Sequence, residues 1–256
     1  MKVIGSDLKG KKILITGASG GLGSVMAHVF ASYDACIGLH YCHDQKRALL
    51  LQKEISKKTS AKIELFKGDL LEQKVRTNLV VDFVKVFGKI DILINNAGAV
   101  GEYKDFFELS EETWDETFAL NVKAPFYLMG SAFEYMKKSD GGRIINISSV
   151  NVKYGGSSKS LHYIASKAAL ESLHRGLVRE GAKYNILINA IRCGLIDTPM
   201  RTRISGYSKK NFQKRMRLVP LQRAGSPLDI ARMALFLASE SGNFITGEIF
   251  TVAGGD

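Results

Sequence analysis

The chain has 256 residues, of which 45% are hydrophobic and 24% are charged. This length and composition allow one domain to bury a large core without disulfides or a structural metal. The three cysteines, Cys36, Cys42 and Cys193, are an odd number and lack the short paired spacing of a disulfide or zinc framework. We therefore expect reduced thiols in a cytoplasmic protein and no metal site.

The formal net charge of +11 would suit a nucleic-acid-binding protein, but the charge is local. Eight basic residues lie between Met200 and Arg223, and this segment contains no acidic residue. A charge confined to one segment does not predict nucleic-acid binding. Residues 1–12 lack an apolar signal-peptide core, and no stretch approaches the roughly 20 apolar residues that cross a bilayer. The sequence therefore predicts no membrane contact.

Short apolar strands and longer helical segments alternate along the chain. The first strand, residues 12–16, is rich in β-branched residues and ends at glycines, and a helix is predicted at 22–33. The alternation continues with strands at 35–41, 62–66, 90–94, 143–147, 186–191 and 249–252, and with helices at 45–58, 75–87, 113–138, 163–183 and 227–238. Pro125 predicts a break within the helix at 113–138. Regular alternation of this kind predicts one α/β domain with a Rossmann-like, doubly wound parallel sheet and helices on both faces.

Ligands of such a sheet bind at the carboxyl ends of its strands, where Gly17, Asp69, Asn95 and Ser148 fall. The first of these ends carries the turn Thr16-Gly17-Ala18-Ser19-Gly20-Gly21-Leu22-Gly23. A glycine turn between a strand and a helix presents free backbone N–H groups and the positive end of the helix dipole, which suit a pyrophosphate. Glycine-rich turns also link strands to helices without any ligand, so this motif alone is weak evidence.

Tyr163 and Lys167 lie four residues apart at the start of the helix predicted at 163–183. This spacing places both side chains on one helix face, about one turn apart. A phenol titrates near pH 10, and a neighbouring ammonium favours the phenolate and lowers its pKa. The pair is therefore a candidate acid/base device. The same spacing also arises by chance in many helices, so its weight depends on the other motifs.

Together these motifs resemble the classical short-chain dehydrogenase/reductase family. The residues that match the motifs of that family are Thr16, Gly17, Gly21 and Gly23 of the glycine turn, Asn95-Asn96-Ala97-Gly98, Asn121, the pair Ser148-Ser149, Tyr163 and Lys167. The resemblance covers essentially the whole chain, as far as Ile245-Thr246-Gly247 and Gly254-Gly255. Within the family, the segment Pro220-Leu221-Gln222-Arg223-Ala224-Gly225 is similar to the 3-oxoacyl-acyl-carrier-protein reductases.

The resemblance implies hydride transfer between a nicotinamide cofactor and a carbonyl or secondary alcohol. Tyr163 would exchange the proton, Lys167 would hold the cofactor ribose, and Ser149 would orient the substrate oxygen. The carbonyl of Asn121 would bind a water of the proton relay, since Pro125 has no N–H to donate to it. These roles make Asn121, Ser149, Tyr163 and Lys167 the expected catalytic residues.

The same resemblance implies a dinucleotide site. Its expected residues are Thr16, Gly17, Ser19, Gly21, Leu22, Gly23, Tyr41, Asp69, Leu70, Asn96, Ala97, Gly98, Tyr163, Lys167, Gly194, Ile196 and Thr198. Asp69 would hydrogen-bond the adenine, or it caps the next helix, or it does both. Thr198 matches the threonine that holds the carboxamide.

We expect NADP(H) rather than NAD(H). The end of the second strand has no acid before Asp44 to bind ribose hydroxyls and repel a 2′-phosphate, and Lys46 and Arg47 follow. The basic residue that the family usually carries inside the glycine motif is absent, because Gly20 stands there.

Two local departures from the family pattern lie near the expected active site. The loop before Tyr163 is one residue longer than usual, which makes Ser149 the nearer match for the catalytic serine and keeps Ser148 as an alternative. Cys193-Gly194 replaces the usual Pro-Gly, which adds a backbone N–H. Cys193 is either filler or an oxidation-sensitive thiol.

The basic segment, about residues 200–223, falls where the family carries its variable substrate loop. Its apolar residues are Ile204, Tyr207, Phe212, Met216 and Leu218. Their interleaving with basic residues predicts either an amphipathic lid that attracts an anionic substrate or acidic partner, or simply a solvated helix face.

Three functional classes follow from these features. The chain would be a small-molecule carbonyl reductase or alcohol dehydrogenase, a reductase of 3-oxoacyl groups on acyl carrier protein, or a non-catalytic dinucleotide sensor. The intact serine, tyrosine and lysine set argues against the sensor. The family resemblance also implies a homotetramer.

Overall fold

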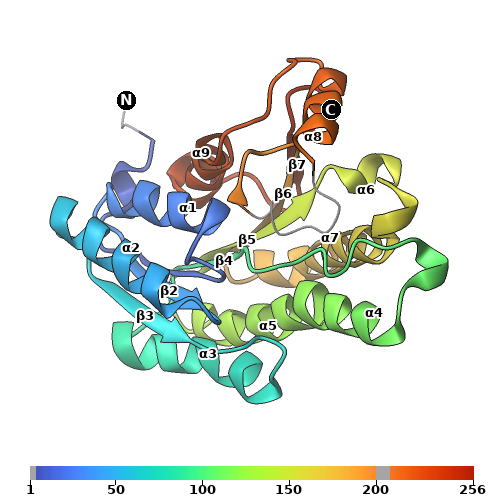
Figure 1. The fold of residues 1–256 in the computed structure, drawn as a ribbon. Coiled ribbons are helices and arrows are strands. Elements are labelled where there is room, and N and C mark those ends of the chain that lie inside the picture. Colours follow the sequence, from blue (N-terminus) through green and yellow to red (C-terminus); the bar gives the residue numbers. More distant parts are fainter. Residues whose placement is uncertain (1–3, 200–207) are drawn as a thin grey trace.

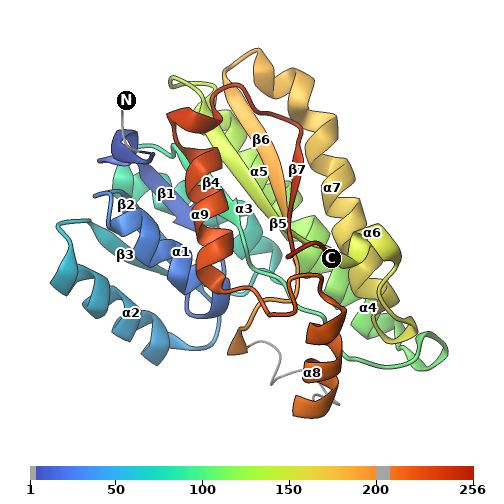
Figure 2. The ribbon, with the colours of Figure 1, turned by 90° about the horizontal axis from the view of Figure 1, so that it is seen from above.

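The computed structural model describes residues 4–199 and 208–256. Its centre is one sheet of seven parallel strands in the order β3-β2-β1-β4-β5-β6-β7 (Figures 1 and 2). The strands are β1 (Lys12–Ile15), β2 (Cys36–Tyr41), β3 (Ile63–Lys67), β4 (Ile92–Asn95), β5 (Gly142–Ser149), β6 (Ile186–Cys193) and β7 (Ile249–Val252). The predicted doubly wound parallel sheet is confirmed.

Helices cover both faces of the sheet (Figure 2). One face carries α1 (Gly21–Ala31), α2 (Gln45–Lys58) and α9 (Pro227–Ala238), and the other carries α3 (Gln73–Phe87), α5 (Ala124–Met136) and α7 (Leu161–Ala182). The other α-helices of the described residues are α4 (Glu111–Phe118), α6 (Asn151–Tyr154) and α8 (Lys209–Leu218). No helix in the described ranges is long and apolar enough to cross a bilayer.

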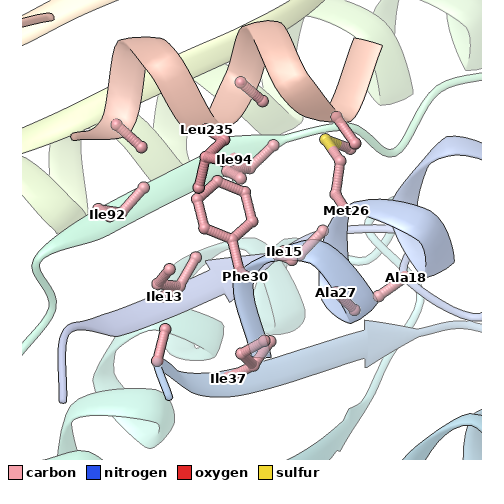
Figure 3. Packing of buried hydrophobic residues seen from close by; sticks show 14 of the residues in the cluster. Ile13, Ile15, Ala18, Met26, Ala27, Phe30, Ile37, Ile92, Ile94 and Leu235 are labelled. Carbon is pink, nitrogen blue, oxygen red and sulfur yellow. The ribbon is translucent and has the colours of Figure 1, made fainter. Parts of the chain in front are cut away.

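The core on one face forms between β1, α1 and α9. Ile13 and Ile15 point from β1 toward Phe30 of α1 and Leu235 of α9 (Figure 3). Leu14, between the two isoleucines, belongs to the cluster on the opposite face, as the alternation of strand side chains requires. Each large side chain that is fully buried in this way contributes about 1.5–3 kcal/mol. The packed layers therefore fix where the carboxyl ends of the strands lie.

The chain reverses its direction of winding between β1 and β4, which are neighbours in the sheet. The loops that follow the two strands therefore lie side by side at the carboxyl edge. A Cβ atom on Gly17 would lie 3.0 Å from Cα of Ala97. This position is the topological switch point, where sheets of this type bind ligands.

The helix predicted at 113–138 is interrupted by a π-helix at Ala119–Lys123. In it the Ala124 N–H donates to the Ala119 carbonyl, one residue further back than in an α-helix. Pro125 lies in the first turn of α5, where its missing N–H is tolerated. The break therefore comes just before the proline that predicted it.

Candidate active site

A cavity of about 530 Å³ opens at the carboxyl ends of the central strands. Most of the predicted site residues line it, namely Gly17, Ser19, Gly21, Leu22, Asp69, Leu70, Asn96, Ala97, Gly98, Ser149, Tyr163, Lys167, Gly194, Ile196 and Thr198. Thr16, Gly23, Tyr41 and Asn121 lie outside this lining. Residues from distant parts of the sequence therefore meet in one space.

The glycine turn forms one wall of the cavity. Gly17 has a φ of +63°, which strains any residue with a side chain. A Cβ on Gly23 would lie 2.5 Å from the Gly17 carbonyl oxygen, so helix α1 packs directly on the turn. Helix α1 begins at Gly21 without a side-chain cap. Its first N–H groups therefore remain available at a cavity wall, an arrangement that fits a pyrophosphate.

Thr16 is fully buried and holds the neighbouring loop instead of facing the cavity. Its hydroxyl accepts hydrogen bonds from the N–H groups of Asn96 and Ala97, both at 3.0 Å. The side-chain amide of Asn96 donates to the Thr16 carbonyl at 2.8 Å. Thr16 therefore fixes the loop after β4, and Gly23 permits the close approach of α1 to the glycine turn.

Tyr41 is also expected at the cofactor site. It is buried and lies outside the cavity, whereas His40 and Cys42 on either side of it line the cavity. Successive side chains of a strand point to opposite faces, so Tyr41 is directed away from the site.

His40 is a site residue that the sequence prediction missed. Its Nδ1 accepts a hydrogen bond from the Gly17 N–H at 3.2 Å, and its Nε2 lies 3.0 Å from the Gly68 carbonyl oxygen, to which it donates. Burial lowers the pKa of His40 to about 4, so the ring is neutral at pH 7. The ring thus joins the turn after β1 to the end of β3. The sequence feature that could have identified this residue is a histidine within an otherwise apolar strand.

Tyr163 and Lys167 come from one face of α7, as predicted. The Lys167 Nζ lies 5.9 Å from the centre of the Tyr163 ring and donates a hydrogen bond to the Ile147 carbonyl at 2.9 Å. Burial raises the pKa of Tyr163 to about 12, and burial lowers the pKa of Lys167 to about 8. The expected lowering of the tyrosine pKa is therefore wrong for this arrangement. Desolvation of the phenolate is the largest cause of this rise, and the Lys167 ammonium is directed to the Ile147 carbonyl.

The two serines of the pair have different partners. The Ser148 hydroxyl donates to a carboxylate oxygen of Glu171 at 2.6 Å. The Ser149 hydroxyl hydrogen-bonds the Tyr163 phenol, which opposes the rise in the phenol pKa. Ser149 is therefore beside the tyrosine, and Ser148 is held by a structural partner. The longer loop after the pair contains the short helix α6.

Glu171 is the centre of a buried network that the sequence prediction missed. Besides the Ser148 hydroxyl, it accepts hydrogen bonds from Nε and Nη2 of Arg192 at 2.8 and 2.6 Å. The hydrogen bonds with Glu171 raise the pKa of Arg192. This network joins β5, β6 and α7 directly behind the Ser149–Tyr163 pair. The sequence feature that could have identified Glu171 is its position one helix turn after Lys167.

Asn121 is fully buried in the π-helix, and its side chain serves the loop after β4. Its Oδ1 accepts from the Ala99 N–H at 3.1 Å, and its Nδ2 donates to the Ala99 carbonyl and to the Ser166 hydroxyl. A Cβ on Gly98 would lie 2.9 Å from Asn121 Oδ1 and 3.0 Å from Lys167 Nζ. The absence of a side chain at Gly98 therefore leaves room for both Asn121 and Lys167 beside the loop after β4. The expected role of Asn121 is different, because it concerns the backbone carbonyl, which would bind a water. Pro125 has no N–H that could donate a hydrogen bond to that carbonyl.

Two cysteines line the cavity, Cys42 and Cys193. Burial raises the pKa of Cys42 to about 11 and the pKa of Cys193 to about 12. Both are therefore thiols at pH 7. For Cys193 this favours a filling role over an activated, oxidation-sensitive thiol.

The predicted basic lid lies partly outside the described residues, which exclude 200–207. The described part forms α8, which Ser208 caps by accepting a hydrogen bond from the Asn211 N–H. None of the α8 side chains is buried, so its basic face is solvated. Arg215 anchors the helix through an ion pair with Asp256 and a hydrogen bond to Tyr154.

Comparison with known proteins gives one consistent family. Residues 17–256 match the family model described as Enoyl-(Acyl carrier protein) reductase. The chain is 33% identical to the 3-oxoacyl-[acyl-carrier-protein] reductase FabG of Aquifex aeolicus, over 97% of this chain and 98% of that protein.

Two solved structures share the fold over nearly the whole chain. A blue fluorescent protein from a metagenomic library, in complex with NADPH, has a TM-score of 0.90 and 30% identity, with 97% of this chain and 98% of that one covered. A short-chain dehydrogenase/reductase from Serratia marcescens has a TM-score of 0.90 and 28% identity, with the same coverage. The chain therefore belongs to the short-chain dehydrogenase/reductase family. It is an oxidoreductase that acts on hydroxyl or carbonyl groups with a nicotinamide cofactor.

Proposed function

We propose that this protein is an NADP(H)-dependent reductase of a carbonyl group, with Tyr163 as the general acid and base. The observation that carries the proposal is the convergence of Ser149, Tyr163 and Lys167 on the cavity that also contains the glycine turn. A bound nicotinamide dinucleotide would supply or accept the hydride.

The residues of the cavity fit a dinucleotide along its length. The glycine turn and the uncapped start of α1 suit the pyrophosphate, and Asp69 suits the adenine end. The carboxylate of Asp69 also accepts the Leu71 N–H at 2.9 Å, so this side chain stabilises a turn before α3 as well. Lys167 would hold a ribose, and Thr198 would hold the carboxamide. We propose that the chain is a single dinucleotide-binding domain with a substrate lid at about 200–223, of which 200–207 lie outside the described residues.

The protonation state of the site suits the direction of reduction. With a pKa of about 12, Tyr163 carries its proton at neutral pH, as an ordinary phenol also does, and this is the form that can donate to a carbonyl oxygen. Ser149 would hydrogen-bond the same oxygen and fix its position. Lys167 remains protonated below about pH 8 and stabilises the negative charge that develops when the phenol gives up its proton. The Asn121 carbonyl would bind the water that restores that proton.

The serine pair offers a direct comparison. We expect Ser149→Ala to lower kcat about 10²-fold, since it removes a hydrogen-bond donor from the reacting oxygen, and to leave the dinucleotide dissociation constant unchanged. Ser148→Ala should mainly lower thermal stability, because its hydroxyl is committed to Glu171. Steady-state kinetics and fluorescence titration with NADPH measure both effects. A larger loss of kcat in Ser148→Ala than in Ser149→Ala would reverse the assignment.

Arg47 supports the choice of NADP(H). A Cβ on Gly20 would lie 3.5 Å from the guanidinium carbon of Arg47, so this side chain brings a positive charge to the position where the family usually has a basic residue. Asp44 is already engaged as the cap of α2 and in an ion pair with Arg47 at 3.8 Å. The similar structure from the metagenomic library was solved with NADPH.

We expect Arg47→Gln to raise the KM for NADPH about 10–100-fold and to leave the KM for NADH nearly unchanged, because a charged hydrogen bond to the 2′-phosphate is lost. Lys46→Gln is the matched control, since the adjacent Lys46 is exposed and lies outside the cavity lining. The proposal would be contradicted if Arg47→Gln changed the KM values for NADPH and NADH equally, or if the wild type preferred NADH.

A second candidate function is the reduction of 3-oxoacyl groups carried on acyl carrier protein. Helix α8 supports it with an exposed basic face formed by Lys209, Lys210, Lys214 and Arg217. The similarity to FabG of Aquifex aeolicus points in the same direction. A basic helix that follows the cavity-lining Thr198 closely in sequence suits an acidic carrier.

Salt dependence tests this second candidate. For a 3-oxoacyl group on acyl carrier protein, kcat/KM should fall about tenfold between low and high salt, since screening weakens the attraction to α8. For the same acyl group on a small neutral thiol, kcat/KM should change little. The double change Lys210→Gln with Lys214→Gln should reproduce the effect of salt. Equal salt dependence of both substrates would exclude carrier recognition by α8.

We also propose that the protein self-associates, as the family resemblance to tetramers implies. Large aromatic side chains are exposed on and beside α4 and α5, namely Phe106, Phe107, Trp114, Phe126 and Tyr127. Large exposed apolar side chains are common at interfaces between subunits.

A further inference from the structure

Cys42, His43 and Asp69 form a cluster of potential metal ligands. One donor atom from each lies within 4.8 Å of the other two. The Cys42 Sγ is 3.4 Å from Nε2 of His43, and it shares a hydrogen bond with Asp69. The cluster forms because β2 and β3 pair in register up to Tyr41 and Lys67, which brings the residues that follow each strand together.

The chemistry of these donors is that of a zinc site. A thiolate sulfur, an imidazole nitrogen and a carboxylate oxygen are its usual ligands, with bonds of about 2.0–2.3 Å. Tetrahedral geometry places the donors about 3.5 Å apart, so Cys42 and His43 would have to rotate toward Asp69 from their present separation of up to 4.8 Å. All three residues line the cavity, so a fourth ligand position would open into it. The mixture of donors distinguishes the cluster from a group of acidic residues.

One of the ligands is already held in place. The Asp69 Oδ1 accepts a hydrogen bond from the Leu71 N–H at 2.9 Å, which fixes the orientation of the carboxylate. Hydrogen bonds of this kind to a ligand commonly strengthen metal sites. His43 is exposed and can adjust to the ion.

We propose that Cys42, His43 and Asp69 bind a thiophilic divalent cation of the Zn²⁺ type. On binding, the Cys42 thiol releases its proton to solvent and its sulfur forms the metal bond. We further infer that the ion and the adenosine end of the dinucleotide exclude each other. This second part rests on the proposed function, because it places the adenine at Asp69. The ion would act at the end of the cavity that is remote from Tyr163.

Metal binding can be measured without turnover. The full chain, free of dinucleotide, is titrated with Zn²⁺ by calorimetry and with Co²⁺ by absorption spectroscopy. We expect one ion per chain and a thiolate-to-cobalt charge-transfer band. Cys42→Ser should abolish the band, and Cys42→Ser, His43→Asn and Asp69→Asn should each weaken Zn²⁺ binding at least about tenfold.

The other two cysteines are the matched controls. Cys36 is engaged with Lys12 at 3.1 Å, and Cys193 lies beside Tyr163, so Cys36→Ser and Cys193→Ser should keep the band. Absence of a thiolate band in the wild type would overturn the proposal. So would loss of the band in Cys193→Ser but not in Cys42→Ser, or unchanged Zn²⁺ affinity in His43→Asn and Asp69→Asn. Circular dichroism checks the fold of each variant, and His43→Asn changes only an exposed side chain.

Competition is tested separately by fluorescence titration with NADPH. In the wild type the apparent Kd of NADPH should rise in proportion to Zn²⁺ concentration, and in Cys42→Ser it should not. An unchanged Kd in the wild type would overturn mutual exclusion. If NADPH binds in neither protein, the proposed function fails, and the calorimetric and cobalt measurements still decide whether the metal site exists.

Discussion

Replacing Tyr163 with phenylalanine is expected to lower kcat about 10²–10⁴-fold, the usual contribution of a positioned general acid. The substitution removes the phenolic proton and leaves the ring that packs beside Lys167. The dissociation constant of NADPH should stay within about twofold, because the pyrophosphate wall of the cavity is unchanged. Steady-state kinetics and fluorescence titration with NADPH measure the two quantities.

Tyr184→Phe is the control for loss of a phenol elsewhere. Tyr184 packs edge-on against Phe133 outside the cavity lining, so its replacement should leave kcat unchanged. The assignment of Tyr163 would be wrong if its phenylalanine variant kept more than about a tenth of the wild-type kcat, well above the range for a lost general acid.

Glu171→Ala should lower the free energy of unfolding by about 3–5 kcal/mol. The change leaves the guanidinium of Arg192 and the hydroxyl of Ser148 without their buried carboxylate partner. The side chain of Glu171 is only 5% exposed, so water cannot readily replace it. Urea unfolding followed by circular dichroism gives the free energy.

A surface ion pair provides the contrast. Glu134 pairs with Lys137 at 3.0 Å, but its side chain is 62% exposed, so Glu134→Ala should change the free energy of unfolding by no more than about 0.5 kcal/mol. A loss below about 1 kcal/mol in Glu171→Ala would mean that the buried network does not stabilise the junction of β5, β6 and α7.

The order of strands and helices could be predicted because local patterns and tertiary packing agree. Helices α2 and α9 begin and end at the predicted residues, and each start has a clear signal in its cap. The Asp44 side chain accepts the Arg47 N–H, and Ser226 and Asp229 form a capping box before the apolar face of α9. Such signals act within a few residues and are visible in a sequence.

The contacts of individual site residues could not be predicted in the same way. Motifs identify Thr16 and Asn121, but only the packed fold shows that their side chains bind neighbouring loops. The spacing of Tyr163 and Lys167 predicts their shared helix face, yet their pKa values depend on burial, which a spacing does not report. Residues from separate strands, such as Cys42 and Asp69, meet only through sheet register.

His40 gives the dinucleotide-binding end of the protein a built-in sensitivity to acid. Its pKa is lowered from 6.5 to about 4 in the folded protein, so the unfolded chain takes up a proton first as the pH falls. The contribution of neutral His40 to the free energy of unfolding is complete above about pH 6.5. It is lost as the pH falls toward 4, which lowers the free energy of unfolding by about 3 kcal/mol. A protonated ring could no longer accept the Gly17 N–H. Acid would therefore loosen the turn meant for the pyrophosphate, while the hydrophobic clusters beneath it, which include no Asp, Glu or His, keep their packing.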